Sequence, residues 1–243
     1  MAWRFLKENK NVRTVVEKVK GFSGELRTLK TKHLAGEKTK EATYKENGCI
    51  FRFNIDEVYF SERLSNERKT VSEEILRLIQ EKKSSKILVM FSGVGPFPIV
   101  LAKEMKRQKI KGIIYSNELN KKAAEYQEKN IVSNKVSDYI RIVDGDAKNL
   151  PKKIKEKFDV ILMPRPNLKE TFLNSAISLS KRGTKIFYYG FGKGDEVLEE
   201  IKKNSGGKIG GISIRKAGDI GVGIYRWLAL LEVDVLRNSK NKE

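Results

Sequence analysis

The sequence predicts an α/β fold built on an open, mostly parallel β-sheet with helices on both of its faces. From Lys86 onward, short apolar runs typical of buried strands alternate with segments of helical periodicity. The first apolar run, Lys86–Phe91, breaks into the turn Gly93-Val94-Gly95 just before a helical pattern. At 243 residues the chain can form one large domain of this class and one small appendage.

The same periodicities predict the elements in order. Five strands are expected first, at Lys86–Phe91, Gly112–Asn117, Ile140–Asp144, Asp159–Met163 and Lys185–Gly190. Helices are expected between and after them, at Pro98–Arg107, Asn120–Val132, Leu168–Ser180 and Gly194–Lys203. Two further β-rich runs, Lys208–Lys216 and Gly223–Val235, have no helical period between them, so we expect an antiparallel pair and seven strands in total.

The residues before the sheet form a separate unit and a helix that leads into the first strand. Cys49–Ile55 alternate with a period of two, which predicts a strand, and residues 1–60 are expected to form a small α/β appendage. A polar start at Ser65–Arg68 precedes apolar residues at helical spacing. We therefore expect a small N-terminal domain at 1–64 and a main domain at 65–243, whose polar end, Arg237–Glu243, frays.

The charge balance favours a polyanionic partner. The chain has 50 Lys and Arg against 31 Asp and Glu, a formal net charge of +19. Such an excess attracts nucleic acid, although a lysine-rich solvated surface of a heat-adapted protein is the alternative. No apolar run approaches the roughly 20 residues of a membrane span, and the N-terminus lacks a signal peptide's apolar centre. We expect a soluble, cytoplasmic and monomeric protein with no membrane contact.

Cysteine and histidine are too scarce for most metal or thiol chemistry. Cys49 and His33 are the only residues of their types. A single cysteine excludes an internal disulfide and a Cys-based zinc site, and a single histidine leaves little for a Ser-His catalytic pair. We expect no metal.

Three features at the ends of successive strands predict a nucleotide-like cofactor. The glycines Gly93 and Gly95 allow a tight turn and close approach of backbone amides to a ligand. Glu118 ends the next strand 23 residues after Gly95, the usual place of a ribose-binding carboxylate. Asp146 follows the third strand, where it could accept a hydrogen bond from an adenine amino group. Each also has a structural interpretation, as a plain turn or a helix cap, but together they indicate an adenosine-bearing cofactor.

The segment Met163-Pro164-Arg165-Pro166 lies at the end of the fourth strand, on the same edge. Two prolines stiffen such a loop, which suits either holding a flat base or simply ending a strand. Arg165 between them is expected to touch phosphate or a base rather than to pack in a core.

Several motifs resemble the archaeal and eukaryotic tRNA guanine-N1-methyltransferase family, which acts beside the anticodon. The matching segments are, in order, Gly24–Arg27, His33–Glu37, Glu46–Phe51, Val58–Arg68, Met90–Phe97, Ile114–Asn120, Asn134–Val136, Gly145–Asp146 and Gly223–Tyr225. The resemblance covers nearly the whole chain, and its most specific parts are Val58–Arg68 and the turn Gly93–Phe97. The sister family, the tRNA-wybutosine aminocarboxypropyltransferases, shares most of the pattern.

The resemblance implies a class I methyltransferase fold that uses S-adenosylmethionine, with the appendage helping to seat tRNA. It implies that Arg27 and Glu67 are catalytic. Glu67 would take the N1 proton of guanine, and Arg27 would stabilise negative charge on O6. The remaining site residues that it implies are, for the cofactor, Phe91, Gly93, Gly95, Glu118, Asp146 and Arg68, and for the substrate, Tyr59, Arg63, Pro164 and Arg165.

The sequence departs from the family pattern at three points. Val89 stands where an acidic residue usually opens the glycine turn, and Pro164 replaces a polar residue of the loop after the fourth strand. The domain that many members use to inspect the tRNA elbow has no counterpart in this sequence, so discrimination among tRNAs would be looser or would rest on residues 1–60. Aminocarboxypropyl transfer and a non-catalytic RNA-binding module therefore stay open as alternatives, and Arg27 and Glu67 speak against the second.

Overall fold

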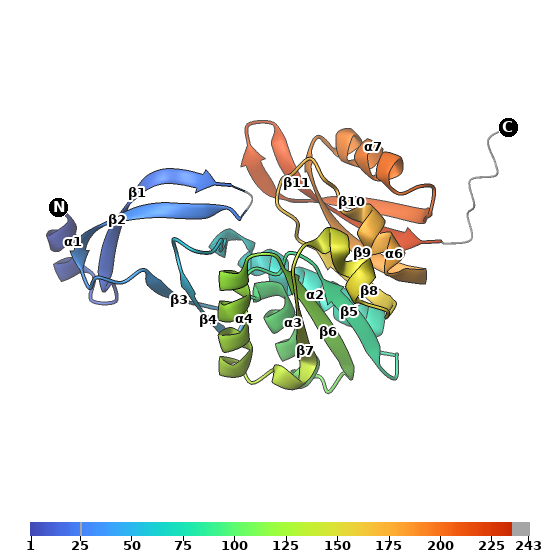
Figure 1. Ribbon diagram of the computed structural model, residues 1–243, viewed down its shortest axis with the longest axis horizontal. Coiled ribbons are helices and arrows are strands. Elements are labelled where there is room, and N and C mark those ends of the chain that lie inside the picture. Colours follow the sequence, from blue (N-terminus) through green and yellow to red (C-terminus); the bar gives the residue numbers. More distant parts are fainter. Residues whose placement is uncertain (25, 235–243) are drawn as a thin grey trace.

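A seven-stranded mixed β-sheet forms the centre of the structure, a computed structural model that describes residues 1–24 and 26–234 (Figure 1). In sheet order the strands are β10 (Ile209–Gly221), β11 (Ile224–Val233), β9 (Ser180–Gly192), β8 (Phe158–Met163), β5 (Ser85–Val89), β6 (Gly112–Glu118) and β7 (Ile140–Asp144). Strands β5 to β9 pair in parallel, and β11 is antiparallel to both β9 and β10. The seven-stranded α/β prediction is confirmed, while Val235 and the tail Arg237–Glu243 lie outside the described residues.

Helices cover both faces of the sheet, as expected for buried parallel strands. One face carries α2 (Ser65–Ile79), α3 (Pro96–Arg107) and α4 (Lys121–Ser133), and the other carries α5 (Leu150–Lys153), α6 (Leu173–Ser178) and α7 (Gly194–Asn204). Neighbouring residues of one strand enter different cores: Val89 packs with the first set of helices, Leu88 and Met90 with the second. This alternation is the period of two that a strand imposes on its side chains.

The strand order reverses at β5, which determines where the site forms. From β5 the chain proceeds to β6 and β7 on one side and then crosses to β8 and β9 on the other. The loops after β5 and β8 therefore leave the sheet in opposite directions. In open α/β sheets a ligand crevice opens at such a switch point, at the carboxyl ends of the strands.

The appendage consists of α1 (Ala2–Glu8) and two hairpins, β1 (Thr14–Ser23) with β2 (Thr28–Gly36) and β3 (Glu41–Glu46) with β4 (Cys49–Asn54). The β1–β2 hairpin projects from the main body (Figure 1). The β3–β4 hairpin does not, because Phe51 and Phe53 join the core that α2, α3 and α4 share. A division at residue 64 stays a prediction, since β4 packs into the main body.

Asn130 of α4 and Asn134, which follows the helix, attach β4 to the main body as a neighbouring strand would. Asn134 accepts from Ile50 N–H at 2.9 Å and donates to Ile50 O at 2.7 Å. Asn130 does the same with Arg52, at 2.9 and 3.1 Å. The edge of β4 is thus satisfied by side-chain amides, which fixes the position of the segment that follows it, including Tyr59.

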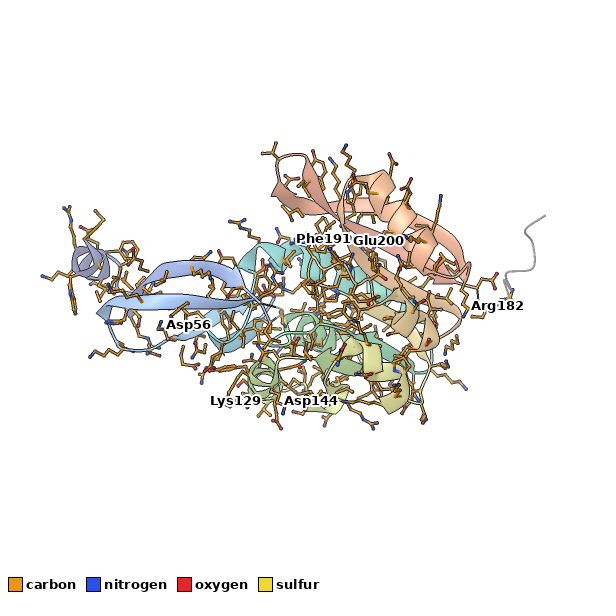
Figure 2. All side chains as sticks on the ribbon, turned by 45° about the horizontal axis from the view of Figure 1, so that its top comes forward. Asp56, Lys129, Asp144, Arg182, Phe191 and Glu200 are labelled. Atoms are coloured by element: carbon orange, nitrogen blue, oxygen red, sulfur yellow. The ribbon has the colours of Figure 1, made fainter. Side chains whose placement is uncertain are left out.

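Asp56 connects the projecting hairpin to this segment, and Figure 2 shows it where the two meet. It accepts hydrogen bonds from Thr31 Oγ1 at 2.6 Å and Lys40 Nζ at 2.9 Å. Burial alone would raise the pKa of Asp56, but these two donors outweigh it and lower the pKa. The middle of β2 is therefore attached to the segment after β4 by charged hydrogen bonds.

The prediction of a helix at Leu168–Ser180 is wrong in its first half, because α6 begins only at Leu173. Arg165 donates to the carbonyls of Leu168 at 2.8 Å and Glu170 at 3.3 Å, so these acceptors hold a loop. Phe172 then adopts a φ of +58°, a left-handed conformation that no helix interior accepts. A long-range side chain has here overridden the local helical pattern.

Candidate functional site

Two adjoining cavities lie at the carboxyl edge of the sheet, and three residues line both: Arg27, Tyr59 and Pro164. The first cavity is formed mainly by the residues after β5, β6 and β7. The second lies between α2, α3, β9 and the tip of the β10–β11 hairpin. Molecules in the two cavities would therefore share these three residues as contacts.

The glycine turn after β5 forms the floor of the first cavity. Gly93 and Gly95 have φ values of +57° and +92°, which L side chains rarely adopt. A Cβ on Gly95 would also come within 2.9 Å of the Gln127 and Ile99 side chains. Glycine is thus required at Gly95 by both conformation and space, and α3 starts immediately after it.

Glu118 is held at the end of β6 by backbone amides. Oε2 accepts from Gly93 N–H at 2.6 Å, and Oε1 accepts from Leu119 N–H at 3.0 Å and Asn120 N–H at 2.8 Å. Burial raises the pKa of Glu118, and these three hydrogen bonds only partly oppose it. The carboxylate is therefore pre-oriented in the cavity wall and links the turn after β5 to the end of β6.

The opposite wall of the first cavity combines a carboxylate with two aromatic rings. Asp146 begins the helical turn Ala147–Asn149, where its Oδ1 accepts from Lys148 N–H at 2.9 Å. The rings of Phe91 and Phe172 meet edge to face, with centroids 4.9 Å apart. Carboxylates for hydroxyl and amino donors beside an apolar slot for a flat ring match the chemistry of an adenosine.

Arg27 and Tyr59 lie where the cavities meet. Arg27 closes the turn Gly24–Arg27 with a φ of +52°, and its guanidinium carbon is 3.9 Å from the centre of the Tyr59 ring. The stretch of chain before Tyr59 is held through Glu57, whose carbonyl accepts from Asn120 Nδ2 at 2.8 Å. Two expected site residues far apart in the sequence are thus stacked on each other beside Glu118.

Glu67 in the first turn of α2 is connected to the second cavity through Tyr189. Tyr189 lines that cavity, and its hydroxyl donates to Glu67 Oε1 at 2.9 Å. Arg215 of β10 donates to Glu67 Oε2 at 3.0 Å and to Glu74 Oε1 at 3.2 Å. Burial and the charge of Glu67 hold the pKa of Tyr189 well above its ordinary value, so its hydroxyl keeps its proton and can donate.

Arg165 is buried, contrary to the expectation. Its side chain is 2% exposed, and its guanidinium donates to Tyr189 O at 3.0 Å and Glu200 Oε1 at 2.7 Å besides the loop carbonyls. Pro164 lines both cavities, and Arg165 lines the second. The expectation that Arg165 would not pack in a core is wrong, because its guanidinium is buried and holds the loop that carries Pro164; its contact with a substrate stays a prediction.

Arg68 is likewise corrected from a cofactor contact to a structural ion pair. It is 1% exposed, pairs in bidentate fashion with the buried Glu46 and donates to Ser61 O at 3.0 Å. Arg68 is not among the residues lining either cavity, and neither is Arg63, which is exposed in the turn Glu62–Leu64. Arg68 therefore attaches α2 to β3.

Sequence reasoning missed Tyr189, Arg215 and Phe172. Tyr189 and Arg215 are 122 and 148 residues from Glu67, and nothing in their own strands marks them as partners of a carboxylate. Phe172 falls inside the helix expected at Leu168–Ser180. Val89 is fully buried in β5, so its side chain offers the first cavity no contact.

Residues 42–208 match the family model described as the TRM5/TYW2 methyltransferase domain. The chain belongs to this family. Its fold is accordingly that of class I methyltransferases: the crystal structure of Trm5b from Pyrococcus abyssi superposes with a TM-score of 0.75 at 32% identity, over 96% of this chain and 68% of that one.

Two characterised relatives differ in how much of their length the chain spans. It is 37% identical over 199 residues to the tRNA (guanine(37)-N(1))-methyltransferase Trm5b of Pyrococcus abyssi. This match covers 80% of the chain and 55% of that protein. It is 32% identical to the tRNA (guanine(37)-N(1))/4-demethylwyosine(37)-methyltransferase Taw22 of Nanoarchaeum equitans, over 92% of the chain and 89% of that protein. The chain thus spans about half of the first relative and most of the second.

Metal-binding clusters and membrane-spanning helices are both absent from the described part of the chain. Within residues 1–24 and 26–234, no group of three or more His, Cys, Asp and Glu side chains is arranged to hold a metal ion. No helix in those ranges combines the length and apolar character needed to cross a membrane.

Proposed function

We propose that this protein transfers a methyl group from S-adenosylmethionine to N1 of the guanosine that follows the anticodon of tRNA. The observation that carries the proposal is the pair of adjoining cavities. One has the chemistry of an adenosine site, the other is connected to the carboxylate of Glu67, and Arg27 and Tyr59 lie at their junction.

The first cavity fits the proposed cofactor. Glu118 would accept a hydrogen bond from a ribose hydroxyl through Oε2, which accepts only one amide N–H and keeps a lone pair to offer. Asp146 would accept from the adenine amino group, and Phe91 and Phe172 would cover the ring. When bound, the cofactor supplies an electrophilic methyl group on a sulfonium.

Glu67 would serve as general base for the guanine. Guanine N1 carries a proton and becomes nucleophilic when that proton leaves, so a carboxylate within reach of the second cavity is the natural acceptor. Both oxygens of Glu67 already accept hydrogen bonds, from Tyr189 and Arg215. These donors orient the carboxylate, and it takes up the proton through its remaining lone pairs.

Arg27 would stabilise the charge that this proton transfer creates. Removal of the N1 proton delocalises negative charge onto guanine O6, and a guanidinium aimed at that oxygen lowers the barrier. Stacking on Tyr59 holds the guanidinium at the junction of the cavities. Tyr59 would thereby position Arg27 and contact the base.

The basic appendage supports tRNA as the partner. Lys20, Lys30 and Lys32 are exposed on the projecting β1–β2 hairpin, and the whole chain carries +19. Phosphate neutralisation by such residues releases counterions, so tRNA affinity should fall steeply as salt rises. A flat salt dependence would argue against tRNA as the substrate.

The deciding experiment is mass spectrometry of nucleosides from unmodified tRNA incubated with the protein and S-adenosylmethionine. The expected product is 1-methylguanosine beside the anticodon, and Glu67→Gln should reduce its formation about 10²–10⁴-fold with little effect on binding of either substrate. Glu73→Gln on the same helix is the matched control. An aminocarboxypropyl nucleoside would instead assign the sister reaction, and no product would favour an RNA-binding module.

A second substrate at the same site is favoured by one comparison. The Nanoarchaeum relative, most of whose length the chain spans, is named for action on both guanosine and 4-demethylwyosine. The wall of both cavities at Pro164 offers no N–H donor that would select one base edge. We propose tRNA bearing the tricyclic base as a second substrate, tested by the same assay with that tRNA.

A further inference from the structure

The tip of the β10–β11 hairpin, residues 220–224, carries three exposed apolar side chains. Val222 is 103% exposed, Ile224 47% and Ile220 39%. These residues form a two-residue turn in which Gly221 pairs with Ile224 and Gly223 has a φ of +69°. A tip of this kind lowers solubility and contributes nothing to the core, so its side chains indicate a partner.

The tip is continuous with the second cavity. Ile220 lines that cavity together with Arg27, which comes from the turn between β1 and β2, so the tips of two hairpins border the same opening. Figure 1 shows the β10–β11 tip (red) reaching toward the end of the β1–β2 hairpin (blue). A molecule in the second cavity would therefore contact Ile220 of the apolar tip.

Cationic groups and aromatic rings lie directly behind the tip. Arg226 lines the cavity, with its guanidinium carbon 5.9 Å from the centre of the Phe191 ring. Lys216 Nζ is 3.6 Å from the centre of the Tyr225 ring. An apolar projection backed by cations fits a stack of bases joined by phosphates better than it fits an apolar protein surface.

We propose that Ile220 and Val222 form a wedge that enters the base stack of the RNA at the place vacated when the target nucleotide turns into the second cavity. This inference rests on the proposed function, because it names how the same site gains access to its base. A base held in a stack cannot present N1 to Glu67, so it must be extruded. The stacking energy that is lost on extrusion must then be compensated. Apolar side chains inserted between bases are a known means of compensation in proteins that bend or open nucleic acids.

The test compares the parental protein with the double variant Ile220→Ser and Val222→Ser. Transcripts of the tRNA carry 2-aminopurine next to the target guanosine. The fluorescence of 2-aminopurine rises when the base loses its stacking. We expect the parental protein to raise the fluorescence on binding in the presence of S-adenosylhomocysteine, and the variant to bind with similar affinity but without this rise. The single-turnover methyl-transfer rate of the variant should fall about tenfold, equivalent to ~1.4 kcal/mol.

Two controls make the result specific. Val132→Ser alters an equally apolar residue, 64% exposed on α4 and in neither cavity lining, and should leave both signals unchanged. A transcript with an abasic site next to the target guanosine lacks the stacking that the wedge must replace, so it should restore the rate of the double variant. Unaltered thermal unfolding shows that the exposed substitutions leave the fold intact.

The outcomes separate the wedge from the proposed function. A double variant that still raises the fluorescence and transfers methyl at the parental rate overturns the wedge and leaves the proposed function standing. A rate loss that the abasic transcript does not restore also overturns it, since the tip would then act on something other than stacking. If the parental protein transfers no methyl group, the proposed function fails, and the fluorescence still decides whether the tip opens the stack.

Discussion

Replacing Glu118 should weaken cofactor binding even when the replacement keeps its shape. The carboxylate accepts three backbone N–H groups with its two oxygens, at 2.6, 2.8 and 3.0 Å. An amide in Glu118→Gln has one accepting oxygen, so in either orientation its NH₂ faces at least one of these N–H groups. Glutamine is therefore expected to disrupt the cavity wall about as much as alanine does.

The magnitude follows from the hydrogen bonds that the substitution removes. A hydrogen bond to a charged group contributes about 1.5–3 kcal/mol, so loss of the ribose hydrogen bond should weaken S-adenosylmethionine binding about 10- to 150-fold. The unpaired backbone N–H groups should lower the free energy of unfolding by roughly 1–3 kcal/mol as well. Isothermal titration calorimetry measures the first effect and urea denaturation the second. Glu125→Gln, which breaks an exposed ion pair on α4, is the control.

The pH dependence provides a separate check. Burial raises the pKa of Glu118 above its ordinary 4.5, so at lower pH both folded and unfolded states hold the proton and no charge is buried. As pH rises through the raised pKa, Glu118 loses its proton, and the buried charge lowers the free energy of unfolding. The same ionisation gives the ribose hydroxyls a stronger hydrogen-bond acceptor. Cofactor affinity should therefore fall as the pH is lowered through that pKa, and only in the parental protein. Unchanged affinity of Glu118→Ala would refute the assignment of Glu118 to the cofactor site.

Three further substitutions test the network around the site. Tyr189→Phe removes a donor to Glu67 and should slow single-turnover methyl transfer about tenfold without changing cofactor affinity; a parental rate would show that the hydroxyl does not orient the carboxylate. Arg165→Met removes a donor from three carbonyls and one of the two donors to Glu200, and should lower the free energy of unfolding by about 1–3 kcal/mol, measured by thermal unfolding. Asp159 is buried, yet three donors led by Lys82 lower its pKa from 3.8 to about 2. Asp159→Asn should therefore lower the free energy of unfolding by about 2 kcal/mol at pH 7, as measured by urea denaturation. This difference should shrink as pH falls through 3.8 toward 2, because the parental protein then loses the same contribution.

The sequence by itself determined the sheet and the edge on which the first cavity forms. Period-two alternation places Val89 and Met90 in different cores, and positive φ at Gly93 and Gly95 is a local requirement of the turn. Glu118 follows from the same logic, because parallel strands end at a common edge. These features depend on neighbours in the chain, which is why their spacing was enough to predict them.

Only the tertiary structure decided what the polar side chains do. Glu67 meets Tyr189 and Arg215 across 122 and 148 residues, a pairing that no local pattern encodes. Arg165, expected at the surface of the ligand edge, is buried because loop carbonyls and Glu200 satisfy its guanidinium more completely than water at an open edge. Its bonds then end the helical pattern before Leu173. A side chain with several donors takes the position where all of them find acceptors, and those acceptors are brought together by the fold rather than by the sequence around it.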